Sequence, residues 1–124
     1  MNAYHLAKTA YAAPGGPTRT EQATEYALFA EITRKIRNAA EEPQDFAALA
    51  EALHENRKLW TILATDVAGP DNKLPASLRA QIYYLAEFTA HHSSGVLARK
   101  HGPEALIEVN TAIMRGLRQQ GQVQ

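Results

Sequence analysis

Apolar side chains recur every three or four residues along most of this chain, the spacing that places side chains on one face of an α-helix. Proline and glycine separate the apolar segments, and both residues interrupt helices. Long helices are predicted in this way over residues 18–40, 44–68, 75–99 and 104–118. A shorter helix is predicted over residues 2–12, before a Pro-Gly-Gly-Pro hinge at positions 14–17.

The most regular pattern lies in the second long segment. Its apolar positions alternate steps of three and four, which keeps one seam of a helix against a partner helix. The seam consists of Phe46, Leu49, Leu53, Asn56, Trp60, Leu63 and Val67. Asn56 is the polar residue in this seam, and a buried amide destabilises a core unless it is hydrogen-bonded. In helical assemblies such a residue can fix the register between helices.

The other long segments carry apolar stripes of the same kind. In the first, the stripe consists of Tyr26, Phe29, Ile32, Ile36 and Ala40. In the third, it consists of Leu78, Ile82, Leu85, His92 and Val96, with Tyr84, Phe88 and His91 beside it. In the last, it consists of Leu106, Asn110, Ile113 and Leu117. Each predicted helix therefore needs a neighbour to cover its apolar face.

Residues at the segment ends match the preferences of helix termini. Thr18 and Glu21 have the spacing of a capping box, and Asp45 stands where the next helix should begin. Gly69 suits the position just past a helix, and Pro75 suits the first turn of the following one. Short loops between long helices predict an all-α antiparallel bundle of about four to five helices. The expected parts are a short helix with hinge over 1–17, a helical domain over 18–118 and a flexible tail over 119–124.

Composition agrees with one all-α domain and narrows the classes of function. The chain has 124 residues, and its 45% apolar fraction comes largely from Ala and Leu, which favour helices. Thirteen basic and thirteen acidic residues cancel, so no net positive charge draws the chain to nucleic acid or anionic lipid. Cysteine is absent, which excludes disulfides and thiolate metal sites. No stretch approaches the ~18 apolar residues of a membrane span, so a cytoplasmic location is expected.

No pattern in the chain predicts catalysis. His54-Glu55 begins like a zinc-protease motif, but the second histidine required at position 58 is Lys58. His91, His92 and His101 lack a carboxylate at ligand spacing. Phosphate-binding glycine loops and nucleophile elbows are also absent from the sequence. We therefore expect a protein that is not an enzyme, with no catalytic residues, no metal ligands and no cofactor.

One block, residues 56–85, resembles a known family. It contains Asn56, Arg57, Leu59 and Trp60, then Ala64, Thr65 and Asp66, then Pro70, Asn72, Leu74, Pro75, Leu78 and Arg79. Near the C-terminus, Asn110 is followed by Ile113, Met114, Gly116 and Leu117. In these residues the chain is similar to the flagellar biosynthesis regulator FlaF, over about residues 18–118.

The resemblance implies a role in flagellar assembly, in which the family promotes flagellin production or export opposite a second regulator, FlbT. It suggests flagellin as the partner, bound as an amphipathic terminal helix in an apolar groove of the bundle. Alanine-lined faces are candidates for such a groove: Ala47, Ala48, Ala50 and Ala52. The alternatives are tight packing of these alanines within the bundle, or a post-transcriptional role through FlbT or flagellin messenger RNA. A third hypothesis is a protein that binds both flagellin and FlbT.

Direct contact with RNA is disfavoured by the neutral charge, although Arg99, Lys100, His101, Arg115 and Arg118 would form a modest basic patch if the last two helices packed side by side. The candidate partner-binding residues are Asn56, Arg57, Trp60, Asp66, Asn72, Arg79 and Asn110. For Trp60 a place in the core is the favoured interpretation, since a lone Trp in a bundle is usually buried. Arg57 either bridges carboxylates of its own chain or offers a bidentate donor to a partner.

Overall fold

A computed structural model describes the backbone of residues 19–123 and the side chains of residues 26–116. Within this range the chain forms four helices, which confirms the all-α prediction. They are α2 (Arg19–Ala40), α3 (Phe46–Ala68), α4 (Ala76–Leu97) and α5 (Glu104–Val123). The predicted helix over 2–12, its hinge and the Thr18 end of the capping box lie outside the described residues.

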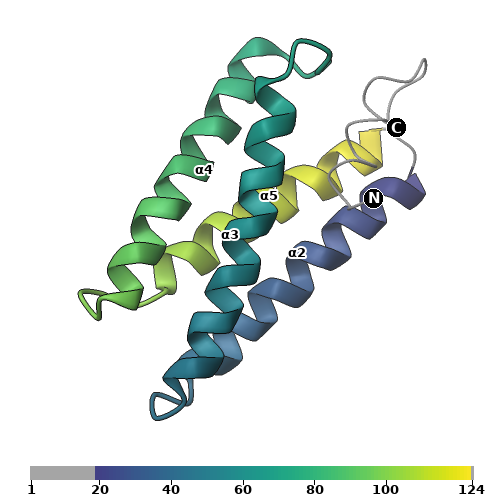
Figure 1. Ribbon diagram of the computed structural model, residues 1–124. Coiled ribbons are helices and arrows are strands. Elements are labelled where there is room, and N and C mark those ends of the chain that lie inside the picture. Colours follow the sequence, from purple (N-terminus) through teal and green to yellow (C-terminus); the bar gives the residue numbers. More distant parts are fainter. Residues whose placement is uncertain (1–18, 124) are drawn as a thin grey trace.

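The helices form a bundle in which α3 lies between α2 and α4, and α5 crosses behind α3 (Figure 1). Helix α5 packs chiefly against α2 and only lightly against α4. Helix α4 therefore depends mainly on α3 for its tertiary contacts. The face of α3 turned away from α5 remains uncovered by any of the described helices (Figure 1).

The core follows the predicted seams. The residues of α3 that are buried in it are Ala52, Leu53, Asn56, Leu59, Trp60, Leu63 and Val67. Phe29, Ile32 and Ile36 come from α2, and Leu106 from α5, to form the same cluster. Removing this apolar surface from water is the main contribution to stability, roughly 25 cal/mol per Å². Residues spaced three and four apart in the sequence thus form one continuous core.

Asp45 caps a helix as predicted, but the left-handed conformation that glycine favours occurs at Arg99 and not at Gly69. Asp45 is the N-cap of α3, and its carboxylate accepts a hydrogen bond from the Ala48 amide at 3.1 Å. Gly69 follows α3, but its φ of −73° is one that any residue adopts. The left-handed conformation instead occurs at Arg99, with φ 61°.

Arg99 occupies the glycine-favoured position of a Schellman motif at the end of α4. Its amide donates to the Val96 carbonyl, and the next amide, of Lys100, donates to the Gly95 carbonyl, both at 2.9 Å. The arginine side chain then lies over the Phe46 ring, 4.2 Å from Cζ to the ring centroid. The attraction between the guanidinium and the aromatic face stabilises this position of Arg99. It offsets part of the strain that a positive φ causes in a residue other than glycine.

Four details of the prediction are wrong. Ala40 is exposed, and its neighbour Ala39 is buried in the stripe of α2. On α4, Tyr84 is 66% exposed and His91 is also exposed, whereas small residues occupy the buried seam. That seam consists of Ile82, Ala86, Thr89, Ser93 and Val96. Helix α5 continues to Val123, beyond the predicted end at residue 118.

Candidate functional site

Three of the predicted partner-binding residues meet in a buried hydrogen-bonded cluster. Trp60 Nε1 donates to Asn110 Oδ1 at 2.8 Å, and Asn110 Nδ2 donates to Asn56 Oδ1 at 2.9 Å. The same Nδ2 donates to Thr33 Oγ1 at 3.1 Å. Asn56 and Asn110 are 0% exposed, and Trp60 is 1% exposed. A partner on the surface of this bundle therefore does not reach these side chains.

The cluster joins three helices through one amide. Asn110 of α5 binds Thr33 of α2 and both Asn56 and Trp60 of α3, so it fixes the rotation and axial position of α5 against the other two helices. The Trp60 ring also meets the Phe29 ring edge to face, with centroids 5.6 Å apart. These bonds favour a single packing arrangement of the three helices, although Asn56 Nδ2 has no hydrogen-bond partner among the described residues. The hydrogen-bond partner expected for Asn56 is thus Asn110.

Thr33, the fourth residue of the cluster, was not among the candidates identified from the sequence. A signal was present, because Thr33 stands four residues after Phe29 and three before Ile36, on the apolar face of its helix. A polar residue at such a position needs a buried hydrogen-bond partner, as Asn56 does. The sequence gives no means of pairing it with a residue in α5.

Two further candidates hold the loop between α3 and α4. Asn72 Oδ1 accepts a hydrogen bond from the Leu74 amide at 3.0 Å, which is an Asx turn. Arg79 Nε donates to the Leu74 carbonyl at 3.0 Å, so the first turn of α4 is tied back to the same residue. Both side chains are half-buried. Their contacts orient the hairpin and leave α4 aligned on α3.

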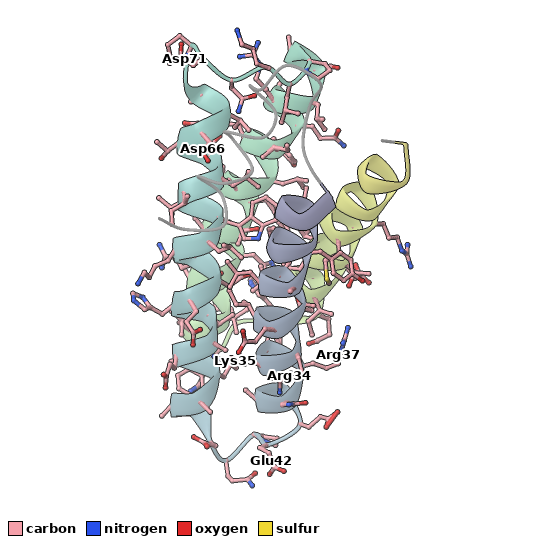
Figure 2. All side chains as sticks on the ribbon, turned by 90° about the vertical axis from the view of Figure 1, so that its right-hand side faces the viewer. Arg34, Lys35, Arg37, Glu42, Asp66 and Asp71 are labelled. Atoms are coloured by element: carbon pink, nitrogen blue, oxygen red, sulfur yellow. The ribbon has the colours of Figure 1, made fainter. Side chains whose placement is uncertain are left out.

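The last two candidates lie on α3 itself. Asp66 is half-buried near the C-terminal end of the helix, and Asp71 lies in the loop beyond it (Figure 2). The Asp66 carbonyl accepts a hydrogen bond from the Gly69 amide at 3.2 Å. Arg57 is exposed. Of the seven candidates, Arg57 is therefore the one whose side chain is exposed.

Arg57 borders a concave surface that runs along α3 beside α4. Its first part, the basic hollow, has a volume of about 400 Å³ and is lined by Ala50, His54, Arg57, Lys58, Thr61 and Leu97, among others. Its second part, the small-residue hollow, has a volume of about 510 Å³ and includes Thr61, Ala64, Ala68, Tyr83, Ala86 and Ala90. Thr61 lines both parts. We call the two hollows together the α3–α4 groove.

The alanines predicted to line a groove are divided between different surfaces. Ala50 lies in the α3–α4 groove. Ala48 and Ala52 instead line a hollow of about 360 Å³ between α2 and α3, and Ala52 is only 3% exposed. This hollow between α2 and α3 is bordered by acidic side chains, among them Glu55, whose carboxylate lies 3.2 Å from Lys35 Nζ. Ala47 is exposed.

The histidines near the end of α4 form a contact of their own. The rings of His92 and His101 stack with centroids 4.0 Å apart, and the His92 ring stacks on Phe88 at 5.2 Å. His101 Nε2 lies 3.1 Å from the His92 carbonyl oxygen, which fixes the turn before α5. Across the described residues, no group of three or more His, Cys, Asp or Glu side chains is placed to hold a metal ion.

The predicted basic patch is not assembled. Arg99 precedes α5, whereas Arg115 lies just past the middle of that helix, about 17 Å along it from Glu104 at the usual helical rise. The side chain of Arg118 lies outside the described residues. Arg99 also turns toward Phe46. None of the described helices has the length and apolar character needed to span a membrane.

A comparison with protein-family models supports the resemblance seen in residues 56–85. Comparisons with curated proteins and with solved structures give no match. A family model described as flagellar protein FlaF matches residues 7–117, which include all four helices except the last residues of α5. The match begins within the predicted N-terminal helix, so the similarity extends further than the block itself indicates. Because the model covers most of the chain, this protein belongs to the FlaF family of flagellar proteins.

Proposed function

We propose that this protein is a noncatalytic cytoplasmic adaptor that binds flagellin and thereby promotes its synthesis or secretion. Membership of a family of flagellar proteins supports the flagellar context. The observation that supports binding is the α3–α4 groove, a hollowed surface whose second part is lined largely by alanines and threonines. Small side chains allow the backbone of a foreign helix to come close, as in the helix-in-groove mode of recognition.

The proposed mechanism rests on the apolar character of assembling segments. A segment that is disordered before assembly exposes its apolar face, and a groove that covers this face prevents premature association. Tyr83 borders the groove and is 45% exposed, and aromatic side chains in such positions often anchor interfaces. Binding would therefore keep flagellin monomeric until export.

Size-exclusion chromatography with light scattering tests this proposal. The protein is mixed with monomeric flagellin at low and at moderately high salt. We expect a stoichiometric complex that persists at the higher salt, because burial of apolar surface is weakly affected by screening. Absence of a complex at both salt concentrations would contradict the proposal and would direct attention to FlbT or flagellin messenger RNA as the primary partner.

A further inference from the structure

The α3–α4 groove has a length that defines the size of its ligand. Along α3 it extends from Ala50 to Ala68, a distance of about 27 Å at 1.5 Å per residue. A partner helix of roughly 18 residues, or five turns, would span this distance. The groove is therefore matched to one helix of ordinary length and not to a short loop or a single side chain.

The two halves of the groove differ in charge. The basic hollow is bordered by His54, Arg57 and Lys58, which are all exposed. Among the described side chains the ion pair is Lys35–Glu55, between α2 and α3. It involves neither Arg57 nor Lys58. The charges of Arg57 and Lys58 are thus unneutralised by the bundle. The small-residue hollow carries the opposite sign at its border, through Glu87 of α4.

This asymmetry identifies the chemistry of the ligand. We infer that the α3–α4 groove binds an amphipathic helix of about 18 residues whose small or apolar face lies against the alanines and whose acidic side chains lie over Arg57 and Lys58. The inference rests on the proposed function and deepens it, because it places the flagellin-binding surface and specifies the bound segment. Acidic groups in that position would gain charge-assisted hydrogen bonds from Arg57, and they also fix the orientation of the helix.

Thr61 offers a way to close the groove without altering the core. Its side chain is exposed and lies where the two hollows join. In Thr61→Trp, the indole would occupy the space needed by a partner helix. The matched control is Ala112→Trp, which introduces the same side chain at an exposed position of α5, outside the groove. Circular dichroism should show equal helix content for both variants.

Charge reversal tests the basic hollow separately. The double variant R57E/K58E reverses the two cations of the groove. Its control, R34E/R37E, makes the same change at two exposed positions of α2, which faces the viewer in Figure 2 and does not line the groove. A flagellin in which acidic residues of the bound helix are replaced by lysine should recover affinity for R57E/K58E.

The measurement is the dissociation constant for monomeric flagellin, obtained by isothermal titration calorimetry at two salt concentrations. We expect Thr61→Trp and R57E/K58E each to weaken binding about tenfold or more, with a smaller salt dependence in R57E/K58E, while both controls bind like the wild type. Wild-type affinity in both groove variants would overturn the inference and leave flagellin binding itself intact. Failure of the wild-type protein to bind would overturn the proposed function and the inference together.

Discussion

Replacing Asn110 by Leu should destabilise the bundle strongly, although the two side chains branch in the same way at Cγ. Asn110 supplies the acceptor for Trp60 Nε1 at 2.8 Å and the donor for Asn56 Oδ1 at 2.9 Å. Leucine provides neither, and it also removes the donor to Thr33 Oγ1 at 3.1 Å, so one buried donor and two buried acceptors lose a partner. Each such loss costs about 1–3 kcal/mol. We therefore expect a decrease of at least about 3 kcal/mol in the free energy of unfolding, a large part of the stability of a small domain.

The assay is urea unfolding followed by far-ultraviolet circular dichroism, which does not depend on the Trp60 signal. Asn38 is exposed on α2, so Asn38→Leu makes the same chemical change outside the core and should shift stability by less than about 0.5 kcal/mol. A double-mutant cycle isolates the indole bond. In the Asn110→Leu background, Trp60→Phe should cost at least about 1 kcal/mol less than in the wild type, because the indole donor has already lost its acceptor.

Two results would contradict the expected role of Asn110. One is a stability of Asn110→Leu equal to that of Asn38→Leu, which would mean that the buried hydrogen bonds contribute nothing net. The other is additivity of Asn110→Leu and Trp60→Phe, which would mean that the two side chains act independently despite their contact.

Three smaller predictions concern the end of α4 and the α3–α4 loop. A Cβ at Gly95 would overlap with the His101 ring, which is held by the His92 ring and carbonyl. Gly95→Ala should therefore stabilise α4 by about 1 kcal/mol in a His101→Ala background but destabilise the wild type, as measured by thermal unfolding. At Arg99, with φ 61°, Arg99→Gly should be about 1 kcal/mol more stable than Arg99→Ala, and equal urea midpoints would contradict the left-handed conformation. Asn72→Ala removes a side-chain acceptor from the α3–α4 loop and should cost about 1 kcal/mol in urea unfolding. The neighbouring Asp71→Ala, at an exposed position, serves as its control.

The helices could be predicted from the sequence, because their causes are local. Spacing of apolar residues, the cap at Asp45 and the break around Gly69 depend on neighbours within a few positions. The same local reasoning identified Asn56 as a buried amide in need of a partner. In α4 it predicted the burial of Ile82 and Val96 correctly but missed Ala86, Thr89 and Ser93, because small and polar residues do not stand out in an apolar pattern.

Which polar residues meet, and which small residues remain uncovered, depends on how the helices pack. The bond between Asn56 and Asn110 joins positions 54 residues apart, and it depends on the rotation and axial position of two helices. No local pattern specifies those quantities. Likewise Ala64 and Ala90 border a groove because α4 packs beside α3 and no helix in the described part of the chain covers their outer face. The helix propensity of alanine is the same on every face of a helix, so it does not show which alanines line a binding surface. That depends on which face the neighbouring helices leave open.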